Sequence, residues 1–296
     1  MHHKKKSSVL FGIILLLIGL SFVVYGQQDA EETAKKNYEQ AKINFNTDPN
    51  EENTIWLGRR TAYLGKYREA IEIYTQGLKR FPNSYKLYRH RGHRFITTRK
   101  FKTAIKDFKK AAALVKGKPL EVEPDGIPNA ANTPVSNTQF NIWYHLGLAY
   151  YLSGDFEQAA SAYRECLKWC NNDDSLVATS HWLYMTYRRM KNKSAAEKLL
   201  EPIKEEMNII ESQDYHALLL MYKGLITPAS LTKTLDSSGT DIQLASATRG
   251  YGLGNWYYYN GEPGKAKQIF ARVLESGNRA AFGYIAAEVD LNNNPF

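Results

Sequence analysis

The chain has 296 residues, of which 43% are hydrophobic and 12% aromatic, and it carries a formal net charge of +9 at pH 7. This length and composition favour one extended array of packed elements over two separate globular domains. The two cysteines, Cys166 and Cys170, are too few and too close in sequence for a disulfide-stapled scaffold, which is excluded.

Residues 1–26 are expected to be an export signal. Lysines at the start precede an apolar run over residues 9–25, and Gly26 offers a small residue at a cleavage site. Two interpretations remain open, a cleaved signal peptide and an uncleaved N-terminal membrane anchor. Either one predicts an exported chain in the bacterial periplasm or cell envelope, which would contact the membrane only through residues 9–25 and only if uncleaved.

Residues 27–50 are predicted to contain one helix. Tyr38, Ala41 and Phe45 recur at helical spacing, and the pattern ends at Pro49. We expect this helix to act as a half-repeat cap, which covers the exposed apolar side of the element that follows it.

Residues 51–116 contain two copies of one pattern. Gly58 and Gly92 lie 34 residues apart, and Ala70 and Ala104 have the same spacing. A large apolar residue beside a small one lets a second helix approach closely, so each copy is predicted to be a hairpin of two helices. Such a hairpin cannot bury its apolar stripes alone, and further copies should therefore stack against it.

Residues 117–139, called the insert below, interrupt the pattern. The matching glycines of the second and third copies are 55 residues apart, where the repeat predicts 34. A loop of this length inside a compact array is typical of a functional or a disordered segment. Two interpretations remain open. The insert is either a solvated linker, or a lid or docking element whose acidic residues lie beside a basic face: Glu121, Glu123 and Asp125.

The pattern resumes over residues 140–210 with two more copies, and a last clear copy covers residues 241–278. Between them, residues 211–240 form a degenerate copy whose second helix is expected to be short. Residues 279–296 are predicted to form a capping helix and a tail. The third copy shows the pattern most clearly, with Trp143, Leu146, Gly147, Tyr150, Ala159 and Tyr163.

At these offsets the pattern resembles the tetratricopeptide repeat, and the chain is similar to exported bacterial members of that family. The resemblance implies an all-α fold, a right-handed superhelical solenoid of antiparallel helix pairs. It also implies that the first helices of the pairs line a concave groove.

The groove positions that the resemblance implies are basic and rich in tyrosine, and none of them is acidic. Arginine and tyrosine are residue types that dominate binding hot spots. The ligand-binding candidates are Arg59, Tyr63, Arg89, His93, Tyr144, Tyr151, His181, Arg188, Tyr251 and Tyr258.

The sequence contains no nucleophile elbow, phosphate loop or zinc-ligand spacing. We therefore predict no catalytic residue, no metal site and no cofactor, and expect that the protein is not an enzyme. Basic residues among tyrosines can also bind single-stranded nucleic acid, but export argues against that ligand.

The favoured hypothesis is a non-catalytic protein–protein interaction scaffold of the cell envelope. It would bind an extended acidic or aromatic segment of a partner in the basic, tyrosine-rich groove. The alternative is a carbohydrate or anionic envelope-polymer binding protein, with tyrosine rings against sugars and arginines against anionic groups. An enzyme with an unrecognised site is a third hypothesis.

Overall fold

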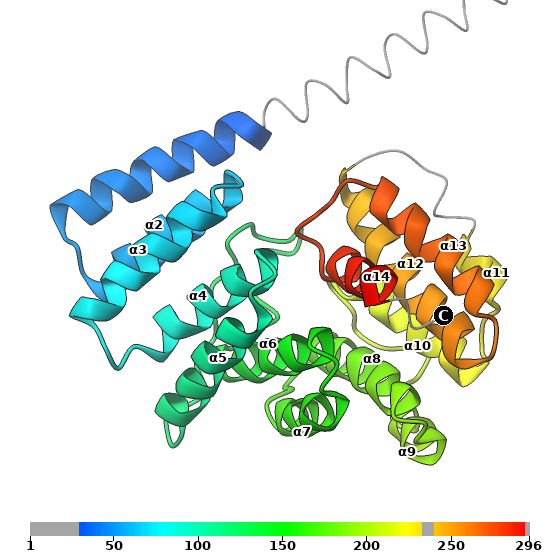
Figure 1. Ribbon diagram of the computed structural model, residues 1–296. Coiled ribbons are helices and arrows are strands. Elements are labelled where there is room, and N and C mark those ends of the chain that lie inside the picture. Colours follow the sequence, from blue (N-terminus) through cyan, green and yellow to red (C-terminus); the bar gives the residue numbers. More distant parts are fainter. Residues whose placement is uncertain (1–29, 233–239, 294–296) are drawn as a thin grey trace, which may run out of the picture.

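The computed structural model describes residues 30–232 and 240–293, and the regular structure in these ranges is helical (Figure 1). The predicted fold class, an all-α solenoid of antiparallel helix pairs, is confirmed. A first helix covers residues 30–47. It is followed by α2 (Glu51–Tyr63), α3 (Tyr67–Arg80), α4 (Tyr85–Thr97), α5 (Phe101–Val115), α6 (Thr138–Leu152), α7 (Phe156–Leu167), α8 (Asp173–Arg189), α9 (Lys193–Leu199), α10 (Gln213–Lys223), α11 (Pro228–Thr232), α12 (Thr240–Tyr259), α13 (Pro263–Glu275) and α14 (Phe282–Asn293).

An aromatic ring of the second helix packs on a glycine of the first helix in four of the helix pairs. In the third pair, a Cβ atom added at Gly147 would lie 2.7 Å from the ring of Tyr163. Close approach of the two helices therefore depends on the missing side chain, as the repeat pattern predicts. The same contact recurs as Gly58 with Tyr74, Gly92 with Phe108, and Gly254 with Phe270.

The turn inside each pair contains one residue with a left-handed backbone. Four of these residues are Gly65, Gly154, Gly224 and Gly261. Repeats two and four instead place Arg99 (φ 62°) and Lys191 (φ 59°) at the matching position. This conformation strains a side chain and therefore favours glycine. Arg99 and Lys191 thus occupy positions at which glycine would be less strained.

The fourth and fifth pairs have short second helices, with 7 residues in α9 and 5 in α11. The loop that connects α9 to α10 is held by Asp174, which is buried near the start of α8. Its carboxylate accepts hydrogen bonds from the backbone N–H groups of Ile210, Glu211 and Ser212, at 2.9, 2.7 and 2.7 Å. The loop is thereby fixed against the concave side of the array.

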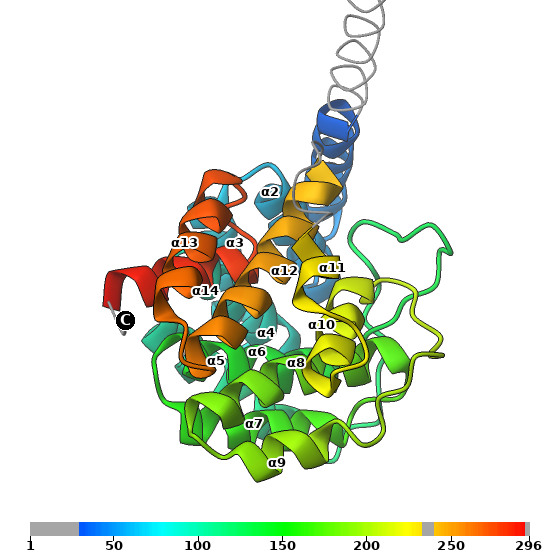
Figure 2. The ribbon, with the colours of Figure 1, turned by 90° about the vertical axis from the view of Figure 1, so that its right-hand side faces the viewer.

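Helix α14 lies on the inner side of the arc that the pairs form, beside α12 and α13 (Figures 1 and 2). It also contacts α6, which is far away in sequence. The ring of Phe282 lies 5.3 Å from His93 of α4 and 5.5 Å from His145 of α6. The C-terminal helix was expected only to cap the last repeat. It instead packs into the concave face, because its apolar residues meet side chains of repeats two and three.

The predicted export signal, residues 1–26, lies outside the described residues. In the part of the chain that the structure describes, every helix is too short or too polar to cross a membrane.

Substitution of Gly147 by Leu should destabilise the array by about 1–3 kcal/mol or more, since the new side chain overlaps the ring of Tyr163. Chemical denaturation followed by circular dichroism measures the effect. The control is Glu157→Leu, which adds a leucine at an exposed position of the facing helix α7. Equal unfolding free energies for the two variants would contradict the close helix contact.

Candidate functional site

The ten predicted groove residues fall into three regions of the concave face. Each region is bounded by different elements, and the three regions differ in how much of their surface is accessible to a ligand. The first region holds Arg59, Tyr63, Arg89 and His93, the middle holds Tyr144, Tyr151, His181 and Tyr251, and the last holds Arg188 and Tyr258.

The middle region is closed by the protein itself. All four predicted residues there are buried, with exposed fractions of 5% or less. The hydroxyls of Tyr151 and Tyr251 lie 2.8 Å apart, and Asn255 Nδ2 donates to Tyr151 Oη at 2.7 Å. Tyr151, His181 and Tyr251 cannot reach a ligand at the surface, which corrects the prediction for these three residues, whereas Tyr144, although buried, lines a pocket of about 290 Å³. The sequence pattern located the concave positions but not what covers them.

One buried carboxylate fixes α14 over this region. Asp290 forms an ion pair with Arg189 of α8 and accepts a hydrogen bond of 3.0 Å from Tyr251 Oη of α12. Arg189 Nε in turn donates to Asn255 Oδ1 at 2.8 Å. Burial raises the pKa of Asp290, although the guanidinium of Arg189 opposes that shift. Helices α8, α12 and α14 therefore meet through one polar network.

The histidines of the concave face are kept neutral by burial. Burial lowers the pKa of His181 to about 3, and it lowers the pKa of His145 well below the usual value. His93 is partly exposed at the surface, but burial and the charge of Arg94 also hold its pKa well below the usual range. The positive charge of the predicted groove thus comes from its arginines.

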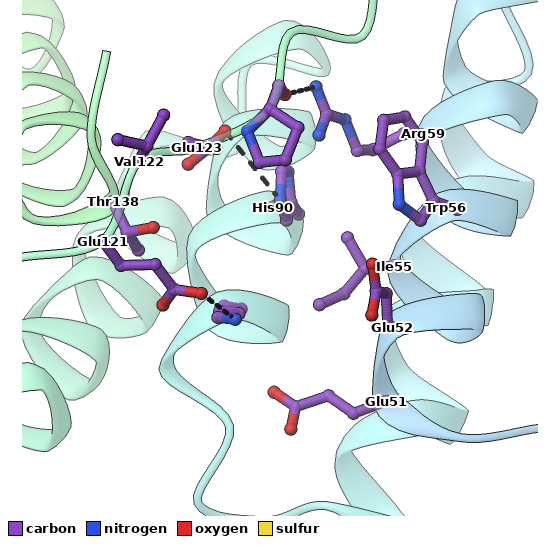
Figure 3. A pocket seen from close by; sticks show the side chains of 12 residues that line it. Glu51, Glu52, Ile55, Trp56, Arg59, His90, Glu121, Val122, Glu123 and Thr138 are labelled. Atoms are coloured by element: carbon purple, nitrogen blue, oxygen red, sulfur yellow. Dashed lines mark hydrogen bonds and ion pairs between the residues drawn. The ribbon is translucent and has the colours of Figure 1, made fainter. Parts of the chain in front are cut away.

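The first region contains a pocket of about 340 Å³ between α2, α4 and the insert (Figure 3). Ile55 and Trp56 of α2 line it on one side, and Val122 and Glu123 of the insert on the other. The guanidinium of Arg59 lies 4.4 Å from the centre of the Trp56 ring. The pocket therefore combines an aromatic wall with charged groups.

The insert is bound to this pocket by its backbone and by its acids. Arg59 Nη2 donates to the carbonyl oxygen of Pro124 at 2.8 Å, and Arg60 Nη1 donates to that of Gly126 at 2.7 Å. Arg89 Nη2 lies 2.8 Å from Glu123 Oε1, and both side chains are less than a tenth exposed. The solvated-linker interpretation is therefore wrong for this part of the insert.

Further contacts hold the first part and the middle of the insert. Glu121 accepts from Tyr85 Oη at 2.9 Å and pairs with Lys86 Nζ at 2.5 Å. Asn129 Nδ2 donates to the carboxylate of Glu211 at 2.6 Å. Glu211 belongs to the loop that precedes α10, and this loop and the insert lie side by side in Figure 2. We call the surface formed by Arg59, Arg60, Lys86 and Arg89 the N-terminal face.

Sequence reasoning missed part of this site. Arg60, Lys86 and Trp56 were not among the candidates, because the repeat pattern does not place them on the inner stripe. The pocket also contains the carboxylates of Glu51 and Glu52, so it is not purely basic. The signal that could have identified Lys86 is the acidic run of the insert, whose charges require basic partners.

A second, smaller cavity of about 110 Å³ adjoins the pocket. Arg59, Arg89, Arg94 and Glu123 are among the residues that line it. Arg89 Nε is buried and has no hydrogen-bond acceptor in the described part of the chain. Three guanidinium groups thus surround the cavity, and one carboxylate lines it.

The last region is an open cleft of about 660 Å³, between the turn from α8 to α9 and the turn from α12 to α13. Two predicted residues, Arg188 and Tyr258, line it and remain partly exposed. We call it the C-terminal cleft.

In the described ranges, no group of three or more His, Cys, Asp and Glu side chains is placed to hold a metal ion. Two family models, both described as tetratricopeptide repeat, match residues 57–119 and 140–173. No protein in the curated set matches the chain.

Solved structures share the fold at low sequence identity. A tetratricopeptide repeat protein from Parabacteroides merdae is 15% identical, with a TM-score of 0.51, over 91% of this chain and 98% of its own. YrrB, described as a TPR protein with an unusual peptide-binding site, is 12% identical, with a TM-score of 0.45, over 85% of this chain and 99% of its own. These likenesses concern the fold alone.

Replacement of Asp290 by Asn should destabilise the protein by about 3 kcal/mol or more, because it leaves the buried Arg189 without a countercharge. Denaturant unfolding measures the loss. Glu275→Gln, which removes an exposed carboxylate from α13, is the matched control. A loss no larger than that of the control would show that the ion pair does not hold α14 in place.

Proposed function

Because the chain is a tetratricopeptide-repeat protein, we propose that it is a non-catalytic scaffold that binds an extended acidic segment of a partner protein on its N-terminal face. Solenoids of this kind present concave surfaces to extended ligands. The partner segment would take the place that the insert holds in the folded chain.

The observation that carries this proposal is how the insert itself is bound. The stretch from Glu121 to Gly126 has no regular structure beyond an isolated bridge between Val122 and Asn137. Arginines donate to its backbone carbonyls, and Arg89 pairs with its carboxylate. Backbone contacts of this type do not depend on sequence, so another acidic stretch could make them equally well. The insert is therefore a model of the ligand.

The insert does not use all the binding capacity of the N-terminal face. Glu123 contacts one terminal nitrogen of Arg89, while Nε has no acceptor in the described residues. A buried donor without an acceptor costs free energy, roughly 1–3 kcal/mol for such a group. A partner whose carboxylate engages both nitrogens of Arg89 would gain a bidentate contact that the insert lacks.

Exchange between the insert and the partner would depend on salt. A tethered segment has an effective concentration on the order of millimolar, so even weak contacts of the insert compete with a free ligand. Arg59, Arg60 and Lys86 are partly exposed, and such charges are screened over about 8 Å at physiological ionic strength.

Replacement of residues 117–136 with Phe-Pro-Asn, the linker of residues 81–83, should tighten binding of a short Glu- and Asp-rich peptide about tenfold or more at low salt. The gain should be smaller at high salt. Fluorescence anisotropy of the labelled peptide measures both. Arg59→Gln/Arg60→Gln in the same background should remove the gain.

A milder variant tests the same exchange without shortening the chain. Glu121→Gln/Glu123→Gln should also tighten peptide binding, whereas Glu205→Gln/Glu206→Gln, which removes two exposed acids elsewhere, should not. Unchanged affinity at every salt concentration would contradict competition by the insert. Loss of binding on replacement would mean that the insert is itself the docking element.

The proposed place of action is the cell envelope. It is motivated by residues 1–26, whose basic start and apolar run are typical of an export signal. We expect the exported protein to begin at Gln27. Intact mass and N-terminal sequencing of protein from its native host check this, and recovery of the whole apolar run in a membrane fraction would favour the anchor.

Carbohydrate binding finds less support. It requires tyrosine rings that face solvent, and Tyr144, Tyr151 and Tyr251 are buried. Tyr63 and Tyr258 keep part of their rings exposed, but they lie in separate regions of the concave face. We therefore do not propose this function.

A further inference from the structure

We propose that the C-terminal cleft is a second binding site, which takes a carboxylate-rich segment of a partner protein independently of the N-terminal face. The cleft is formed by the turns that follow α8 and α12. It shares no residue with the N-terminal face, and the insert does not line it.

Positive charge in the cleft exceeds negative charge. Four cationic residues and no carboxylate line it: Arg188, Arg189, Lys191 and Lys193. Two of these have partners, since Arg189 pairs with Asp290 and Lys193 lies 3.5 Å from the exposed Glu197. In the described residues, no carboxylate lies within ion-pair distance of Arg188 or Lys191. Glu262, which lies between the lining residues Gly261 and Pro263, forms an ion pair with Lys265 at 2.5 Å.

The guanidinium of Arg188 is held in place by neutral groups. Its Nη1 donates to Tyr184 Oη at 3.1 Å, and its Nη2 donates to Asn260 Oδ1 at 2.8 Å. It also lies over the ring of Tyr259, 4.3 Å from the ring centre. A guanidinium has five N–H donors, so three remain for a ligand. An oriented arginine without a countercharge is suited to bidentate recognition of a carboxylate.

The tyrosines of the cleft orient arginines rather than offer free faces. One face of Tyr259 is covered by Arg188, and the centre of the Tyr258 ring lies 4.6 Å from the guanidinium of Arg189. A sugar ring needs an open aromatic face on which to stack, whereas an anion needs oriented donors. The arrangement therefore favours a carboxylate over a neutral saccharide.

Lys191 gives a second, independent indication. It occupies the turn position where four other repeats have glycine, and its φ of 59° is strained for a side chain. In repeat two, the matching Arg99 forms an ion pair with Glu288 at 2.6 Å. Lys191 has no such partner in the described chain, yet it is exposed beside Arg188 on the cleft. Residues in sparsely populated conformations cluster at binding sites.

The test is an anisotropy titration of the full chain carrying Arg59→Gln/Arg60→Gln, so that the N-terminal face does not hold the labelled, short Glu- and Asp-rich peptide. Arg188→Gln/Lys191→Gln should weaken binding at least about tenfold at low salt, because two charged contacts are lost. Lys191→Gln alone should give a smaller loss of affinity. Because Lys191 lies at an exposed turn, this substitution should leave the fold intact, so a loss in this variant reports on binding rather than on misfolding. The matched control Lys102→Gln/Lys106→Gln removes the same charge from the exposed side of α5 and should leave the affinity within about twofold.

Three results would overturn the proposal. An equal loss in the Lys102/Lys106 control would mean that the peptide responds to net charge alone. Loss of binding in the Arg59→Gln/Arg60→Gln chain itself, with no effect of Arg188→Gln/Lys191→Gln in the otherwise unchanged chain, would assign all binding to the N-terminal face and leave the function proposed above intact. Full competition by inorganic phosphate at the peptide's own concentration would make the cleft a site for free anions, rather than for a protein segment.

Discussion

The buried ion pair between Asp290 and Arg189 determines how this array closes. It joins α14 to α8, and through Tyr251 to α12. A repeat array is usually held by contacts between neighbours only, so that its stability is close to a sum over repeats. Here Tyr151 of the third repeat bonds to Tyr251 of the sixth, which lies 100 residues further along the chain. We therefore expect the third to sixth repeats to unfold as one unit rather than from an end.

Two segments of the chain fill the concave surface that the repeats create. Helix α14 covers its middle with apolar and carboxylate side chains, and the insert covers the N-terminal face with backbone carbonyls and acids. Both therefore bring negative charge to a basic surface. In the described residues, pockets stay open beside Trp56, beside Tyr144 and beside Arg188, so the scaffold has separate places for a partner instead of one continuous groove.

The repeats could be predicted from the sequence because their signal is local. Gly147 and Tyr163 lie sixteen residues apart in one hairpin, and this spacing recurs wherever two helices must approach closely. The groove could be predicted only as a stripe of positions, because periodicity shows which face is concave but not what covers it. Nothing local marks Phe282 or Asp290 as partners of residues in repeats two to four. Glu123 was different, since its charge made contact with a basic face one of the two interpretations of the insert, and the structure gives Arg89 as its partner.

The position of α14 in the sequence has a consequence for biosynthesis. Chains fold from the N-terminus while they are made, at about 5–20 residues per second. All six helix pairs precede α14, so for a period of seconds the repeats exist without the carboxylate of Asp290. During that time Arg189 lacks its countercharge, and the tyrosines of the middle region are not yet covered. The nascent chain thus exposes a basic, aromatic surface that is buried in the finished protein.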